Sequence, residues 1–283
     1  LPKEQRPRGI EVNYTFSKEV FTYPLVYPAH CEAPSDVFGE AYLPMSLLVH
    51  EMAELLLVLP EAPPFIVPDG RVKLAGLSYQ SHHHTRWFRD GYANYASWIA
   101  LQELKRATRG EWDHTALFPL QTPFSSLEKT RTDLLRWRQN KASVSEESNY
   151  NACFGLFLAL EQDFGIEKLA RLPVELATVR YPDGEAIEKT INRVYGFTLT
   201  EYLAETPFFP DLGIDVSKRS TSGKALRVFR PLEDCRMESC SGPIRLGSVN
   251  QVAVPNRLSF EQEVFLNLRA GKNLTLEFIN ESE

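Results

Sequence analysis

Residues 50–54 of this 283-residue chain read HEMAE and could place two metal ligands on one helix. Side chains four residues apart on an α-helix lie on the same face about one turn from each other, so His50 and Glu54 can point at one ion. Zinc accepts both imidazole nitrogen and carboxylate oxygen as ligands. Glu51 projects from a neighbouring face, where its carboxylate can hold a water molecule beside that ion. The spacing is therefore compatible with metal-assisted hydrolysis in which Glu51 is the general base.

The same residues also allow an interpretation without chemistry. Charged residues four apart are common on exposed helix faces, and a histidine among them is usually an ordinary surface or core residue. The segment alone is more typical of such a helix than of a metal site. Its interpretation therefore depends on the rest of the chain.

Two further segments favour the metal site. Residues 86–95 read RWFRDGYANY, and residues 150–165 read YNACFGLFLALEQDFG. The first resembles the gluzincin signature W-x-x-E-G-x-A-x-Y, with Asp90 in place of the metal-binding Glu. The second resembles the gluzincin helix that opens with a tyrosine and ends at a glycine, although Ala152 and Cys153 replace its Lys-Gly pair. Because the three segments follow the family's order over residues 45–205, the chain resembles a gluzincin-type zinc metallopeptidase, with an aminopeptidase-like catalytic domain and an altered HExxE motif.

This resemblance implies a metal centre and a reaction. His50, Glu54 and Asp90 would ligate zinc or another divalent metal. Glu51 would activate a metal-bound water, and Tyr150 would stabilise the oxyanion formed from a peptide or protein substrate. One nitrogen and two carboxylates make a harder and more negative ligand set than the family's, which raises the pKa of a bound water.

Three alternatives stay open at this metal centre. One imidazole of the triplet His82-His83-His84, which shortly precedes Asp90, could replace the missing histidine ligand, although such a triplet is more often partly exposed. The chain could also be a catalytically inactive pseudo-peptidase that binds peptides or serves as a scaffold. In the third alternative, Glu54 and Asp90 only make hydrogen bonds between helices.

The C-terminal segment resembles a PDZ domain. Residues 242–254 read GPIRLGSVNQVAV and are similar to the PDZ run G-D-x-I-x-x-V-N-G-x-x-V, while residues 260–268 fit the helix and 269–278 the final strand of that fold. PDZ domains bind an extended peptide at a sheet edge. The alternative is a small β-rich domain that only packs against the helical one.

The patterns predict an α+β protein with two domains. Helical spacing of apolar residues and Gly or Pro stop signals predict helices over 45–59, 86–106, 125–140, 150–164, 166–179, 184–194 and 199–204. Short β-like runs are expected at 10–16, 225–229, 244–249, 251–254 and 273–279. We therefore expect a mostly helical zincin-like domain over residues 1–210, followed by a small β-rich PDZ-like domain over residues 211–283.

Composition narrows the partners and the location. A hydrophobic content of 43% is enough for a folded core, and a net charge of −6 gives no reason to expect nucleic acid as a partner. No apolar run approaches the ~18 residues of a membrane span. No signal peptide is visible, but the chain begins at Leu1 rather than Met, so a leader could have been removed. A periplasmic or secreted location is the expectation, and the oligomeric state stays open.

Overall fold

The computed structural model describes the backbone of most of the chain after residue 81 and of several shorter stretches before it. The described residues are 9–16, 19–26, 46, 49–50, 53–54, 65–66, 72–73, 82–111, 113, 115, 118–137, 145–176, 178–179, 182–205, 209–210, 212, 214–217, 226–230 and 244–280. The chain divides into two compact units, Leu1–Pro44 and Met45–Glu283. The predicted domain boundary after residue 210 falls inside the second unit and stays a prediction.

The first unit contains a β-hairpin. Strands β1 (Gly9–Phe16) and β2 (Glu19–Val26) pair antiparallel, from Gly9 opposite Val26 to Phe16 opposite Glu19. Alternating residues predict β1, whereas β2 lies outside the predicted strands. Pro24 lies within this strand of the two-stranded sheet. A proline is tolerated there because an edge strand does not need every backbone N–H for pairing.

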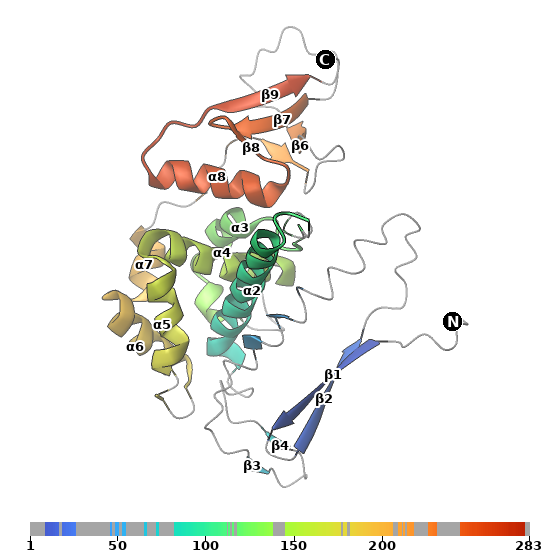
Figure 1. Ribbon diagram of the computed structural model, residues 1–283. Helices are drawn as coiled ribbons and strands as arrows, with labels where there is room; N and C mark the ends of the chain where they lie inside the picture. The colour runs from blue at the N-terminus through green and yellow to red at the C-terminus, as the bar shows by residue number, and fades with distance from the viewer. Residues whose placement is uncertain are drawn as a thin grey trace, which may run out of the picture. The chain divides into compact units, whose positions relative to one another are not determined.

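The second unit is mostly helical (Figure 1). Its elements before the C-terminal sheet are β3 (Phe65–Ile66), β4 (Val72–Lys73), α2 (His82–Ala107), α3 (Pro123–Thr130), the 3-10 helix η4 (Leu134–Arg136), α4 (Glu146–Phe164), α5 (Ile166–Leu176), α6 (Gly184–Tyr195) and α7 (Leu199–Glu205). Five of the predicted helices correspond to single α-helices within a few residues at each end. The predicted helix 125–140 is shorter: the chain leaves α3 after Thr130, and η4 then leads to Trp137.

Helix α4 is the centre of the helical core. Every side chain from Asn151 to Leu160 is buried, so the helix is covered on all sides. It begins before its predicted start because the Ser145 hydroxyl accepts a hydrogen bond from the Ser148 N–H, and it ends at Gly165, whose φ is 83°. Helix α2 approaches α4 at Gly91, where a Cβ would lie 2.7 Å from the Phe157 ring. The glycine of the RWFRDGYANY segment therefore lets α2 pack closely on α4.

The C-terminal part of the unit is an antiparallel sheet with one helix. The strands are β5 (Asp215–Val216), β6 (Leu226–Arg230), β7 (Ile244–Val249), β8 (Val252–Ala253) and β9 (Leu276–Asn280). Strand β7 is central, because its Leu246 pairs with Leu226 of β6 on one side and with Phe278 of β9 on the other. The predicted α+β class, mostly helical with a small C-terminal sheet, is confirmed, whereas the PDZ-like and zincin-like characters stay predictions.

Helix α8 (Arg257–Arg269) contacts both β7 and α3 and so joins the sheet to the helical core (Figure 1). The rings of Phe265 and Phe124 stack with centroids 4.1 Å apart. The fully buried carboxylate of Glu261 accepts hydrogen bonds from the N–H groups of Phe124 (2.9 Å) and Ser125 (3.2 Å). Because these are orphan donors at the start of α3, Glu261 caps that helix from another part of the chain.

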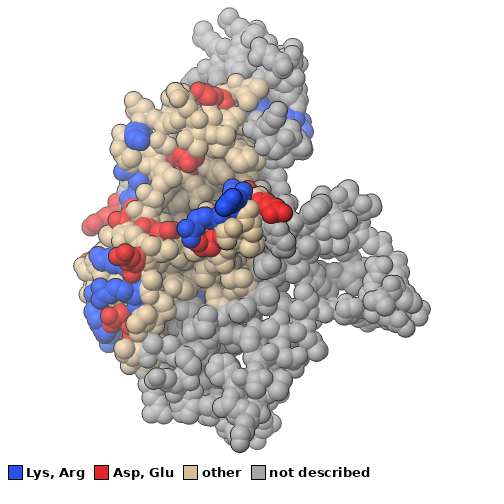
Figure 2. Space-filling view, viewed as in Figure 1, with Lys and Arg blue, Asp and Glu red and all other residues tan. Residues whose placement is uncertain are grey.

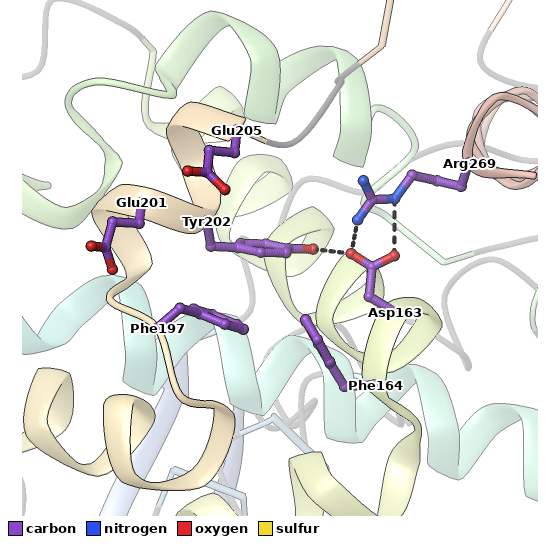
Figure 3. Close-up of a pocket in the computed structure, with 7 residues that line it drawn as sticks. All are labelled: Asp163, Phe164, Phe197, Glu201, Tyr202, Glu205 and Arg269. Atoms are coloured by element: carbon purple, nitrogen blue, oxygen red, sulfur yellow. Dashed lines mark hydrogen bonds and ion pairs between the residues drawn. The ribbon is translucent and has the colours of Figure 1, made fainter. Parts of the chain in front are cut away.

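A second carboxylate ties the far end of α8 to α4 (Figure 3). The Arg269 Nε donates to the Asp163 Oδ1 at 2.9 Å, and the Tyr202 hydroxyl donates to the Asp163 Oδ2 at 2.7 Å. These residues line an open hollow of about 440 Å³ whose walls include the rings of Phe164 and Phe197. The Asp163 carboxylate in this hollow is thus hydrogen-bonded by both the guanidinium and the hydroxyl.

We expect Glu261→Ala to lower the free energy of unfolding by about 3 kcal/mol, since it leaves two backbone donors buried without an acceptor. Glu261→Gln keeps one acceptor and should cost less. Chemical denaturation measures both, with Glu263→Ala on the same helix as the matched control, for which a change within about 0.5 kcal/mol is expected. Equal costs for Glu261→Ala and the control would show that the cap does not stabilise the fold.

Candidate metal centre

The candidate ligands lie on two neighbouring helices. Ser46, Val49, His50, Ala53 and Glu54 are helical, which agrees with the predicted helix 45–59 at the residues described there, and Asp90 lies on α2. The Ser97 hydroxyl of α2 donates to the backbone carbonyl of Ser46 at 2.9 Å. This contact joins the two helices one turn from His50.

His50, Glu54 and Asp90 come together as the sequence predicts. One ligand atom from each lies within 4.8 Å of the other two, so the group could hold a metal ion. The side chains of His50 and Glu54 are each 12% exposed, and that of Asp90 is 4% exposed. The group offers one nitrogen and two carboxylate oxygens, a set that suits zinc or a harder divalent ion.

Asn94 orients the histidine. His50 Nδ1 lies 2.9 Å from the Oδ1 of Asn94, which accepts a hydrogen bond, so Nδ1 carries a proton. The other ring nitrogen, Nε2, then lies 3.3 Å from the Oε1 of Glu54 and faces the ligand group. Metal-binding histidines are commonly held in this way by a second residue that bonds the remote nitrogen. Asn94 follows Asp90 by four residues on α2, so it faces the same side of the helix.

Two arginines that the sequence reasoning did not single out lie among the ligands. The Arg89 guanidinium contacts both carboxylates, with Nε 3.2 Å from the Glu54 Oε1 and Nη2 3.4 Å from the Asp90 Oδ2. The Arg86 Nε lies 3.6 Å from that same Asp90 oxygen. Arg86 could have been paired with Asp90 from their spacing of four residues, but nothing in the local pattern connects Arg89 with Glu54.

The arginines offset part of the buried negative charge. Burial alone would raise the pKa of Glu54, but the hydrogen bond from His50 and the charge of Arg89 outweigh it, so this pKa lies below its usual value. Burial, followed by the negative charge of Glu54, raises the pKa of Asp90 to about 6. The attraction of Arg89 and Arg86 only partly offsets these two effects. Asp90 is therefore the weaker acid of the pair.

Tyr150 lies beside the same group. Its hydroxyl oxygen accepts a hydrogen bond of 2.8 Å from the Arg86 Nη2, and its ring meets the Trp137 ring edge to face at 4.9 Å. The guanidinium of Arg86 also covers the Trp137 ring at 4.3 Å and pairs with Glu146 at 2.8 Å. Burial, and then the charge of Asp90, raises the pKa of Tyr150. The phenol therefore keeps its proton and can donate a hydrogen bond.

Four of the predicted residues lie partly or wholly outside the described part of the chain. Glu51, the predicted general base, lies wholly outside it. His82, His83 and His84 form the first turn of α2, but their side chains are not among those described. The predicted roles of all four residues therefore stay predictions.

The charges of this group act both on a divalent ion and on each other. Two unit charges 4 Å apart interact by about 4 kcal/mol at an effective dielectric constant near 20. A divalent ion among these ligands would thus be attracted by Glu54 and Asp90 but repelled by two guanidinium groups. The site could hold a metal ion, and it also satisfies its buried carboxylates with protein cations alone.

Comparisons of the chain with protein-family models, with curated proteins and with solved structures found no match in any of the three. The gluzincin resemblance therefore stays a hypothesis carried by the residues themselves. Within the described residues, the helices are all too short or too polar to cross a membrane. On the face shown in Figure 2, acidic and basic side chains of the described residues lie interspersed.

We expect the ionisation of Asp90 to destabilise the ion-free protein. Its pKa rises from 3.8 to about 6 on folding, so the folded state binds the proton more tightly and loses stability as pH rises through this range. Relative to Asp90→Asn, the free energy of unfolding of the wild type should fall by up to about 3 kcal/mol between about pH 4 and 7. Denaturation across this range in the presence of a chelator measures the difference.

The exposed residue Asp133, on the turn before η4, provides the control for this pH series. The difference between the wild type and Asp133→Asn should stay within about 0.5 kcal/mol at every pH. An equally flat difference for Asp90→Asn would contradict the raised pKa.

Proposed function

We propose that this protein is a hydrolase of gluzincin-like architecture that depends on a divalent metal and cleaves peptide bonds. The observation that carries the proposal is the convergence of His50, Glu54 and Asp90, whose ligand atoms lie within 4.8 Å of one another. The three side chains come from two helices and are nearly buried. Such a group is unusual without a role, because burying two carboxylates side by side is costly.

In this proposal, each residue has a separate task. His50, Glu54 and Asp90 hold the ion, and Asn94 fixes the histidine with its Nε2 towards the group. A bound divalent ion supplies Lewis-acid polarisation of the peptide carbonyl and makes a water molecule more acidic. Glu51 takes a proton from the attacking water and passes it to the departing amine.

Tyr150 is the proposed oxyanion donor. The Arg86 Nη2 donates to the phenol oxygen, which leaves the phenolic O–H available to a substrate oxygen. The positive charge of the guanidinium makes that O–H a stronger donor. The contacts of Arg86 with Trp137 and Glu146 restrict the guanidinium and thereby the tyrosine.

A second candidate is a peptide-binding or scaffold protein that has lost the reaction. The observation that favours it is the pairing of both candidate ligand carboxylates with arginines, which compensates their charge without a metal. In this case the C-terminal sheet would supply peptide binding at a strand edge, as expected for a PDZ-like domain. The two candidate functions differ in whether the activity of the protein depends on Glu51.

We expect the protein stripped with a chelator and then reconstituted with Zn²⁺ to cleave unstructured peptides, and Glu51→Gln to lower that rate by about 10²-fold or more. Mass spectrometry of the products measures cleavage, and calorimetric titration should show Zn²⁺ affinity unchanged by the substitution. Glu128→Gln, at an exposed position on α3, is the matched control. Peptide binding without cleavage, unaffected by Glu51→Gln or by chelator, would favour the scaffold instead.

We also expect Tyr150→Phe to lower kcat by roughly 10²-fold with little change in KM, because the phenol acts on charge that develops in the transition state. Steady-state kinetics on one cleaved peptide measures both constants. Tyr202→Phe, which removes a hydroxyl distant in sequence from this group and bonded to Asp163, is the control. Equal kcat values for the two variants would remove Tyr150 from the mechanism.

A further inference from the structure

Arg89 touches the same atoms that a metal ion would need. Its guanidinium lies 3.2 Å from the Glu54 Oε1 and 3.4 Å from the Asp90 Oδ2, and so bridges the two carboxylates. The Nε2 of His50 lies 3.3 Å from that same Oε1. The arginine and the histidine thus contact the same oxygen of Glu54.

Arg86 is also close to the ligands but is held differently. It reaches only one of the two carboxylates, at 3.6 Å, and its guanidinium is fixed by Tyr150, Glu146 and the Trp137 ring. Moving Arg86 would break all of these contacts. Because Arg89 contacts both carboxylates, it is the cation that a divalent ion would have to displace.

We propose that Arg89 is a built-in competitor of the metal ion, which occupies the ligand carboxylates in the ion-free protein and sets the affinity of the site. A divalent ion binds only when the guanidinium leaves Glu54 and Asp90. The inference rests on the metal-binding part of the proposed function, but not on catalysis. It explains how two nearly buried carboxylates coexist in an ion-free fold, since one guanidinium satisfies an oxygen of each.

The exchange predicts an inverse relation between the charge at position 89 and metal affinity. Arg89→Met keeps much of the side-chain volume and removes the cation, so the ion no longer competes with it. Arg89→Lys keeps the charge, but a single ammonium group does not match the fork that bridges the two carboxylates. The order of Zn²⁺ affinity should be Met above Lys, and Lys at or above the wild type.

Calorimetric titration of the chelator-stripped full chain with Zn²⁺, repeated with Mn²⁺, tests the proposal. We expect Arg89→Met to bind Zn²⁺ at least about tenfold more tightly than the wild type, and saturating Zn²⁺ to raise its Tm by more. Arg106→Met is the matched control, because Arg106 lies exposed on the same helix and pairs with Glu103. Adding His50→Ala to Arg89→Met should abolish the gain, which assigns the binding to this site.

If Arg89→Met does not fold without an ion, Arg89→Gln is judged by the same criterion, because its amide can still donate to Glu54. Zn²⁺ affinity in the folded neutral variant equal to or weaker than that of the wild type would overturn the proposal. A neutral variant that binds tightly beside a wild type that cleaves no peptide would support Arg89 as competitor while the proposed hydrolase fails. If the wild type cleaves peptides but the neutral variant gains no Zn²⁺ affinity, the proposed hydrolase is supported and Arg89 as competitor is contradicted.

Discussion

The burial of like charges side by side constrains this structure more than any other feature. Glu54 and Asp90 approach within the reach of one ion while almost excluded from water, and each negative charge must be compensated there. The compensation comes from Arg89, which bridges both carboxylates, and from Arg86, which holds Asp90 and then reaches Tyr150. These contacts join the helix of His50 and Glu54, α2 and the start of α4.

Carboxylates that accept hydrogen bonds from another element also join the C-terminal part of the chain to the helical core. Glu261 of α8 caps the first turn of α3, and Asp163 of α4 holds Arg269 from the end of α8. Helix α4 carries Tyr150 near its start and Asp163 near its end. Its close packing at Gly91 and around Phe157 leaves little freedom between the helices. The position of Tyr150 therefore depends on the same core that anchors the sheet.

The two candidate functions use this charge balance in different ways. The proposed hydrolase needs a divalent ion between His50, Glu54 and Asp90, and Arg89, which bridges the two carboxylates, would then be displaced. A peptide-binding scaffold keeps that arginine in place and needs no ion. The ligand residues alone do not separate these possibilities, because carboxylates serve guanidinium groups and metal ions equally well. The neighbouring cations decide how strongly the centre can attract an ion.

The sequence by itself determined most of the helical segments, the α+β class and the candidate ligands, because apolar spacing, caps and stop residues act over a few neighbouring positions. It placed His50 and Glu54 on one helix face by their spacing, and Asp90 and Tyr150 only through a family resemblance. The contacts of Arg89 and Asn94 were decided by the tertiary structure alone. Helix α2 is buried on every side from Thr85 to Gly91, so no polar face marks which residues point towards the ligands. Only the packing of the first helix, α2 and α4 brings charges that lie 35 residues or more apart within 4 Å, and a local pattern cannot encode that approach.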